Sequence, residues 1–523
     1  MSQTILLIAA IVPIAWLFVG LCILHLPGHA VCPSGLLIAA VLAFSFRQLD
    51  LKGILTGALE GALFAWWPIL LVVLAAMILY RYSVATGGMD RITELLSGIS
   101  SDERVQVLIL AWGFGGFLEG IAGFGTPVLI PGCILVALGM NPFKAIVVCL
   151  IANTAATPFA TLGIPVQTMA AATGLDLHAI GVFTATQLFL PCLILPFLLV
   201  VVAGGSFRAV RGVARIALLS GLSFAVPLWL LSYFAGPTLP TLCGSICAMF
   251  CTAWAAKRFG PKAQKKEVSG GAAAALPRKA MAVSQQAVLQ KVSLPSALLP
   301  YILVIAVVFI CNLIPPVHDA LARIQTTAEF FSGENPGSVS FAWILTPGIL
   351  ILVATFLACA IHRTSLRTLF GIMRDTFFGS YKMIITILTI VAMAKVMNYA
   401  GMMNSIAIAL VAVFGGLYPL IAPLIGTFGV FITGSDTTCA ILLGTLQQNA
   451  ALQIGANPTW IASANMSGAA IGKMLSPQSI AIGYGIGGIG KSEGDILVQT
   501  LRYGIPLSVF IGVIVFVGNY LLG

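Results

Sequence analysis

Charged side chains are too scarce in this chain to cover a water-soluble globule. Only 8% of the 523 residues are Asp, Glu, Lys or Arg, whereas 59% are hydrophobic. A soluble domain is about one-quarter charged, because its surface faces water. Lipid must therefore solvate most of this surface, which excludes a cytosolic enzyme, a disulfide scaffold and a disordered tail. The excess of 26 Lys and Arg over 16 Asp and Glu then indicates basic cytoplasmic loops rather than nucleic-acid binding.

Long apolar runs predict an all-α, polytopic membrane protein with about 12–14 transmembrane helices. The first run, 5–24, follows no basic segment, so we expect a retained spanning helix rather than a signal peptide. Several other runs are too short to cross alone and predict broken helices or re-entrant hairpins. Basic residues in 206–215 and 257–293 predict cytoplasmic loops, and acidic residues in 316–340 predict an outer one.

The chain also repeats itself. Three pairs of similar segments occur in the same order and at nearly the same spacing, aligning Met89 with Met402, Gly120 with Gly434, and Asn153 with Asn465. We therefore predict two transmembrane repeats, 1–205 and 297–523, separated by a segment 206–296 with two linking spans and the basic loop. Internal repeats of this kind, often inverted, are typical of secondary transporters. Inversion would place the C-terminus outside.

Each repeat carries two polar segments that Gly and Pro interrupt at the predicted membrane depth. They are GGFLEGIAGFGTP (115–127), NTAATPFATLGIPVQT (153–168), FITGSDTTCAI (431–441) and NMSGAAIGKMLSPQS (465–479). Exposed backbone is costly in lipid, so such breaks persist only around a wet cavity or inside protein. The half-helix N-termini carry a partial positive charge and suit a carboxylate. At Gly53, Gly57 and Gly61, by contrast, we expect close helix packing.

Glu119, Asp436 and Lys473 are the clearest ionisable residues at this depth, and each lies in one of the four segments. A charge at mid-membrane costs about 2.5–3.5 kcal/mol on insertion scales, so each is a functional candidate. The two carboxyl groups are candidates for proton coupling. Lys473 either neutralises one of them or binds a substrate carboxylate, and the sequence leaves both open. We expect Glu60 at the membrane interface and Lys395 to extend toward it.

Three segments carry a family resemblance: FLEGIAGFGTPV (117–128), FITGSDTT (431–438) and GKMLSPQSIAIG (472–483). They resemble signature segments of the bacterial L-lactate permease family, which includes glycolate permeases, and the resemblance extends over nearly the whole chain. It implies proton-coupled symport of L-lactate, glycolate and related 2-hydroxy monocarboxylates across the inner membrane. It also implies an inverted-repeat, elevator-like architecture.

The motif positions supply the candidate site. Glu119 and Asp436 are the candidates for proton coupling. Because Thr433 stands in the second half where Glu119 stands in the first, one acid or two could bind protons. The candidate substrate-binding residues are Gly120, Gly123, Thr126, Asn153, Ser435, Thr437, Thr438, Asn465, Lys473, Ser476 and Gln478.

The sequence bears on two other classes of function. A Na⁺-coupled carboxylate carrier is the alternative, because unwound carbonyls and hydroxyl oxygens suit Na⁺ as well. A membrane enzyme or sensor is disfavoured, since the sequence shows neither a metal-ligand cluster nor a nucleophile–base pair nor a soluble signalling domain. We expect no metal and no cofactor; the partners are the anion, a proton and the bilayer. The oligomeric state stays open, with a homodimer as one candidate.

Overall fold

The computed structural model describes residues 3–20, 24, 26–46, 49–121, 123, 125–259, 292–333, 338–483, 486 and 491–522. This part of the chain is almost wholly helical. Within it, ten helical stretches are long and apolar enough to cross a membrane, and three shorter apolar helices accompany them. The prediction of an all-α, polytopic membrane protein is confirmed. Most of the predicted basic loop 257–293 lies outside the described residues.

The helices before residue 260 follow one another along the chain. They are α1 (Gln3–Phe18), α2 (Gly28–Ser45), α3 (Leu51–Phe64), η2 (Ala65–Leu70), α4 (Leu71–Ala85), α5 (Gly88–Ser97), α6 (Glu103–Val107), η3 (Leu108–Phe114), α7 (Gly115–Ile121), α8 (Thr126–Ala137), α9 (Pro142–Asn153), η4 (Thr154–Phe159), α10 (Ala160–Thr173), α11 (Leu177–Gly204), η5 (Phe207–Val210), α12 (Ala214–Phe234) and α13 (Pro240–Phe259).

The second half contains a β-hairpin as well as helices. Its elements are α14 (Leu294–Leu313), α15 (Pro315–Ala322), β1 (Gln325–Glu329), β2 (Ser338–Ala342), α16 (Pro347–Ile361), α17 (Leu366–Gly379), α18 (Tyr381–Tyr399), α19 (Met402–Phe414), η7 (Gly415–Leu417), α20 (Tyr418–Thr433), α21 (Asp436–Gln453), α22 (Pro458–Leu475), α23 (Pro477–Gly483) and α24 (Glu493–Leu522). The strands are antiparallel, with Gln325 opposite Ala342.

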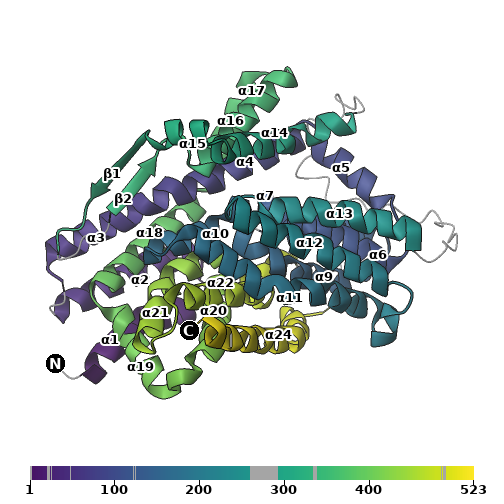
Figure 1. Ribbon diagram of the computed structural model, residues 1–523. Helices are drawn as coiled ribbons and strands as arrows, with labels where there is room; N and C mark the ends of the chain where they lie inside the picture. The colour runs from purple at the N-terminus through teal and green to yellow at the C-terminus, as the bar shows by residue number, and fades with distance from the viewer. Residues whose placement is uncertain are drawn as a thin grey trace.

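Helices α18 and α4 each pack against helices of the other half of the chain (Figure 1). From the second half, α18 packs against α2 and α3; from the first, α4 packs against α16. A Cβ at Gly61 would lie 2.6 Å from the Cα of Ala392, so only glycine permits this approach of α3 to α18. At Gly57 a Cβ would lie 3.3 Å from Cδ2 of Tyr399 on α18. Close helix packing is therefore confirmed at Gly57 and Gly61. At Gly53 the nearest atom to a Cβ is Oδ1 of Asp50, the cap of the same helix, so helix packing is not confirmed there.

A buried ion pair lies at the same contact between α3 and α18. Oε1 of Glu60 lies 3.0 Å from Nζ of Lys395 and accepts a hydrogen bond of 2.7 Å from the hydroxyl of Tyr399. The Phe331 ring stacks on Tyr399 with 3.6 Å between the ring centroids. The Glu60 side chain has no exposed surface, and its depth relative to the membrane interface stays a prediction. The ammonium of Lys395 neutralises the carboxylate of Glu60, a partner that the sequence did not predict.

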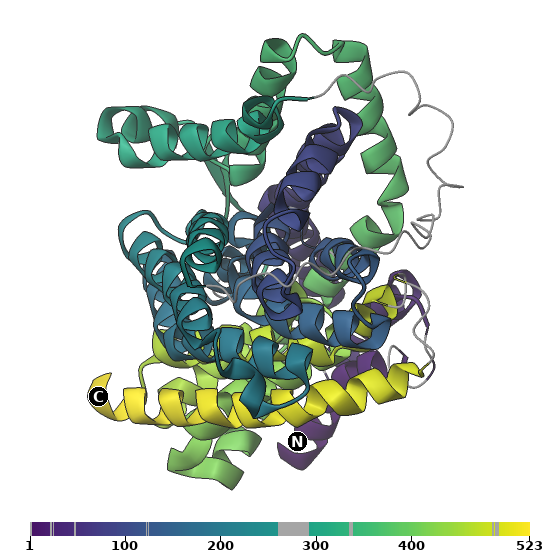
Figure 2. The same ribbon diagram turned by 90° about the vertical axis from the view of Figure 1, so that its right-hand side faces the viewer.

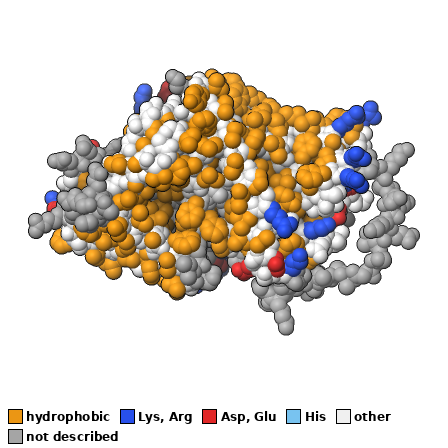
Figure 3. Space-filling model, turned by 90° about the horizontal axis from the view of Figure 1, so that it is seen from below, with side chains coloured by type: hydrophobic (Ala, Val, Ile, Leu, Met, Phe, Trp, Pro, Cys, Tyr) orange, Lys and Arg blue, Asp and Glu red, His pale blue; other side chains and the backbone are white. Residues whose placement is uncertain are grey.

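The helices that contain the predicted breaks form the interior of the molecule. α10 packs against α21, α22 packs against α20 and α21, and α23 reaches α8 and α9. The long helices α11 and α24 flank this group; Figure 2 shows α24 running across the lower part of the molecule, beside α20 and α22. Hydrophobic side chains cover the middle of the face in Figure 3, as a lipid-facing surface requires.

Candidate functional site

The first break separates α7 from α8. Gly123 and Gly125 have φ angles of +56° and +84°, which glycine adopts without strain. The hydroxyl of Thr126, the first residue of α8, donates a 2.8 Å hydrogen bond to the carbonyl of Gly123 and so fixes the turn. Glu119 lies in the last turn of α7, directly before this break.

The second break follows the 3₁₀ turn η4. Thr161, Leu162 and Gly163 have φ angles of 46°, 58° and 82°. A left-handed conformation costs a non-glycine residue about 1–2 kcal/mol, so the surroundings must hold Thr161 and Leu162 in place. The side-chain amide of Gln167 does so in part, by donating a 2.9 Å hydrogen bond to the carbonyl of Leu162. Gly163 is pressed against the carbonyl of Pro237 and has no room for a Cβ.

The third break separates α20 from α21. Gly434 ends α20 with a φ of +68°. Ser435 caps α21, because its hydroxyl accepts a 3.3 Å hydrogen bond from the backbone N–H of Thr438. Asp436 lies in the first turn of α21, where the helix dipole favours a negative charge.

The fourth break lies between α22 and α23, which the extended residue Ser476 joins. Lys473 lies in the last turn of α22, and its Nζ donates a 2.9 Å hydrogen bond to the carbonyl of Gly434. The side chain of Gln478 in α23 also packs on Gly434, where it fills the space of a Cβ. These two contacts to Gly434 therefore hold the third and fourth breaks against each other.

All four breaks border one cavity of about 640 Å³, including its open mouth. The first half contributes polar groups from Glu119, Gly123 and Thr161, and the second half contributes Ser435, Asp436, Thr437, Lys473, Gln478 and Ser479. Val73, Ile164 and Ile482 form part of the apolar wall. The cavity thus has both polar and apolar lining residues, which come from both halves.

The cavity holds two carboxyl groups and one ammonium group. Glu119 and Asp436 are almost fully buried, at 2% and 4% exposure. Oε2 of Glu119 and Oδ1 of Asp436 accept no hydrogen bond from any described residue. The charge of Lys473 acts on both carboxyl groups, yet among the described contacts neither lies within the 4.0 Å of an ion pair with it. Carboxyl oxygens are therefore available to bind a proton or a ligand.

Three of the predicted residues do not line the cavity but stabilise the breaks that border it. Thr126 fixes the first break, the N–H of Thr438 completes the cap of α21, and the buried Ser476 forms the turn between α22 and α23. Asn153 is also buried, and its side-chain amide interacts with the carboxyl of Glu119.

Two predicted residues lie elsewhere. Gly120 faces α13, since a Cβ there would lie 3.3 Å from the backbone nitrogen of Leu242. Asn465 belongs to a buried network inside the second half, where its Oδ1 accepts a 3.3 Å hydrogen bond from Gln447. The same Gln447 accepts a 2.8 Å hydrogen bond from the hydroxyl of Tyr418. Neither Gly120 nor Asn465 lines the cavity.

Some lining residues escaped the sequence prediction. Thr161 and Ser479 lie inside the polar segments 153–168 and 465–479, so the signal for them was present. Val73 and Ile482 are ordinary apolar residues of membrane helices, and nothing in the sequence separates them from lipid-facing positions.

Sequence comparisons with known proteins match nearly the whole chain. The family model described as L-lactate permease matches residues 6–522. An L-lactate permease from Streptococcus iniae is 41% identical over 87% of this chain and 93% of its own. The glycolate permease GlcA from Escherichia coli K12 is 31% identical over 98% of this chain and 95% of its own. The solved structure of MtrF from Neisseria gonorrhoeae is 13% identical, with a TM-score of 0.46 over 88% of this chain and 83% of that one.

Proposed function

The chain belongs to the L-lactate permease family, and we propose that it transports L-lactate and glycolate together with a proton. It is a multi-pass protein of the bacterial cell membrane, and its named relatives are permeases rather than enzymes. One observation carries the proposal: four broken helices border a single cavity that contains Glu119, Asp436 and Lys473.

Two positive elements suit the substrate carboxylate. Lys473 supplies a full charge, and the N-terminus of α21 supplies a partial positive charge. Only one hydrogen bond from Lys473 goes to Gly434, so the ammonium keeps donors for a ligand. A substrate carboxylate beside Lys473 and the end of α21 would form charge-assisted hydrogen bonds, which are stronger than neutral ones.

The charge balance of the cavity supports proton coupling. With both acids ionised, Glu119 and Asp436 outweigh Lys473 by one negative charge. An incoming monocarboxylate adds another, and an uncompensated buried charge is expensive. A proton on either acid offsets the charge of the substrate. Glu119 is the better candidate, because Asp436 already gains from the dipole of α21.

Hydroxyl recognition would select 2-hydroxy acids. Ser435, Thr437 and Gln478 offer donors and acceptors on the wall that also holds Lys473. The apolar residues Ile164 and Ile482 suit the methyl group of lactate. A substrate that lacks the hydroxyl would leave one of these buried polar groups unpaired, which lowers affinity.

The architecture that fits this site is a pair of inverted repeats, 1–205 and 297–523, joined by the linking segment 206–296. The order of broken helices is the same in both: α7–α8 and α9–α10 in the first, α20–α21 and α22–α23 in the second. Such repeats meet at the substrate site in secondary transporters. An elevator-like movement would then carry the broken helices against a frame that includes α3, α4 and α18.

Competition for labelled L-lactate uptake tests the substrate assignment. In proteoliposomes of the purified protein, glycolate should compete with lactate, whereas propionate should compete at least about fivefold more weakly, because a buried polar group left unpaired costs roughly 1–3 kcal/mol. Equal competition by propionate would show that the hydroxyl is not recognised.

A further inference from the structure

The connection between α11 and α12 carries an exposed aromatic ring among arginines. Phe207, the first residue of η5, is 85% exposed. Arg208, Arg211 and Arg215 are exposed on the same short stretch. Both flanking helices are candidate membrane spans, so this connection lies where a span leaves the bilayer. A ring this exposed gains nothing from water and suits the edge of the lipid phase.

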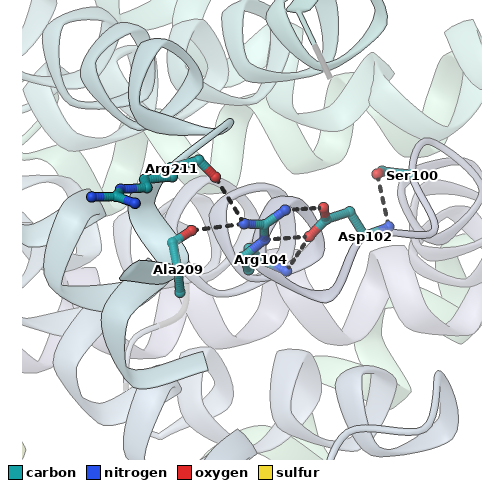
Figure 4. Close-up of polar contacts among 5 residues, drawn as sticks. All are labelled: Ser100, Asp102, Arg104, Ala209 and Arg211. Atoms are coloured by element: carbon teal, nitrogen blue, oxygen red, sulfur yellow. Dashed lines mark hydrogen bonds and ion pairs between the residues drawn. The ribbon is translucent and has the colours of Figure 1, made fainter. Parts of the chain in front are cut away.

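Arg104 holds this connection in one conformation (Figure 4). Its Nη1 donates hydrogen bonds of 2.7 Å to the carbonyl of Ala209 and 3.2 Å to that of Arg211. Its other nitrogens donate to both carboxyl oxygens of Asp102, at 3.0 and 2.7 Å. Burial raises the pKa of Asp102, but the hydrogen bonds from Arg104 outweigh it and hold the pKa below its usual value. Asp102 therefore stays ionised at neutral pH and neutralises Arg104.

The other cations at this end have no such partner. The end of α13 lies beside the start of α12, because Thr252 and Ser220 share a 2.8 Å hydrogen bond between their hydroxyls. This brings two more exposed basic residues to the same level. In the described structure none of the five forms an ion pair; they are Arg208, Arg211, Arg215, Lys257 and Arg258. Figure 4 shows the guanidinium of Arg211 pointing away from Arg104.

Aromatic residues mark the depth of these cations. Trp254 is 60% exposed and lies directly before Lys257 and Arg258 on α13, with its ring edge-on to that of Phe259 at 5.9 Å. Exposed Trp is typical of the headgroup level of a bilayer. In Figure 3, most visible Lys and Arg side chains lie toward the right-hand end, with a few Asp and Glu side chains beside them, while hydrophobic side chains fill the middle of the face. The cations thus lie where lipid phosphates lie.

We propose that these five residues and Phe207 form a binding surface for an anionic phospholipid, here called the η5 patch. Arginines bind phosphate through parallel N–H donors, and Arg208 and Arg211 present two such groups that form no ion pair with a described acidic residue. Phe207 contacts the acyl chains, which a free phosphate lacks. The bound lipid holds the connection between α11 and α12 at the membrane surface.

Lipid titration with matched variants tests the η5 patch. Fluorescent phosphatidylglycerol is titrated into the full-length protein in detergent, with phosphatidylcholine and inorganic phosphate as competitors. The double change Arg208→Gln with Arg211→Gln should weaken binding about 20- to 30-fold, since each basic residue near an anionic headgroup contributes about fivefold. The control, Lys52→Gln with Arg323→Gln, removes as much charge from exposed sites elsewhere and should change affinity less than about twofold. Equal losses in both variants, or displacement by phosphatidylcholine or inorganic phosphate, would overturn the proposal.

A variant with unchanged net charge tests whether lipid binding depends on the conformation of η5 as well as on its charge. Asp102→Ala with Arg104→Ala removes one acid and one base, and with them the hydrogen bonds that fix η5. Phosphatidylglycerol binding should weaken several-fold with the net charge unchanged, while a monodisperse size-exclusion peak verifies folding. If this variant binds as tightly as the parent protein, a pre-ordered η5 is not part of the site. If Phe207→Ser also leaves binding unchanged, the acyl-chain contact is wrong.

Discussion

Nζ of Lys473 lies 2.9 Å from the carbonyl oxygen of Gly434, so the last turn of α22 is bonded to the residue that ends α20. This contact sets the ammonium beside the N-terminus of α21 and beside Asp436 without forming an ion pair with either acid of the cavity. Lys473 thus connects two broken helices and faces the cavity with its remaining donors.

Loss of this ammonium should weaken anion binding more than folding. Lys473→Met should reduce lactate affinity about ten- to a hundredfold, the effect of one lost charge-assisted hydrogen bond. Lys473→Arg should also bind poorly, because a planar guanidinium does not replace a compact ammonium. Lactate binding to the purified variants, measured by calorimetry, gives both values.

A double variant distinguishes the two roles of Lys473. If Lys473 mainly neutralises Asp436, then Lys473→Met combined with Asp436→Asn should recover the uptake that either single change loses. The proposed substrate role predicts no recovery, because the double variant still lacks the cation that binds the carboxylate.

Glu119 should be the coupling residue. In Glu119→Gln the group can no longer release a proton, so uptake driven by a pH gradient should be abolished while lactate exchange continues. Asn153, whose amide interacts with Glu119, offers a milder change: Asn153→Ala should shift the pH at which uptake is half-maximal without abolishing it. Unchanged accumulation in Glu119→Gln would exclude this carboxyl as the proton site.

Substitution of two glycines with the same backbone φ angle distinguishes the effect of backbone strain from the effect of a lost contact in the site. Gly434 and Gly455 both have a φ of +68°, but a Cβ at Gly434 meets Gln478 whereas a Cβ at Gly455 meets nothing within 4 Å. Gly455→Ala should lower the free energy of unfolding by about 1–2 kcal/mol through backbone strain, and Gly434→Ala by at least as much. Only Gly434→Ala should abolish lactate transport. Loss of transport in Gly455→Ala would mean that strain alone is responsible.

The buried pair between the halves should matter for stability. Lys395→Met leaves the Glu60 carboxylate unpaired, which should cost about 3–5 kcal/mol of unfolding free energy. Lys395→Met with Glu60→Gln should regain most of it. The exposed pair of Arg374 and Asp375 serves as the control, since Arg374→Ala should cost less than about 1 kcal/mol. Thermal unfolding in detergent reports all three.

The breaks were predictable from the sequence because Gly and Pro among polar residues are costly at membrane depth unless they line a cavity. All four segments border the cavity, and Glu119, Asp436 and Lys473 lie on it. Linear spacing does not give the direction in which a helix faces, and so Gly120 packs on α13 while Asn465 joins the network with Gln447.

Contacts between distant segments could not be predicted from the sequence. The partners Glu60 and Lys395 lie in different halves, and each alone looks like a residue near a span end. The left-handed backbone at Thr161 and Leu162 was also unpredictable, because these residue types disfavour it and only the packed surroundings hold it. The repeat boundaries at 205 and 297 stay a prediction.

Gradient-driven uptake tests the central proposal most directly. Proteoliposomes of the purified protein are given labelled L-lactate with an inward proton gradient, an inward Na⁺ gradient, or neither. Lactate should accumulate only with the proton gradient, and Glu119→Gln should remove that accumulation. Accumulation driven by Na⁺ alone would contradict proton coupling, and the absence of lactate uptake under every gradient would contradict the transport function itself.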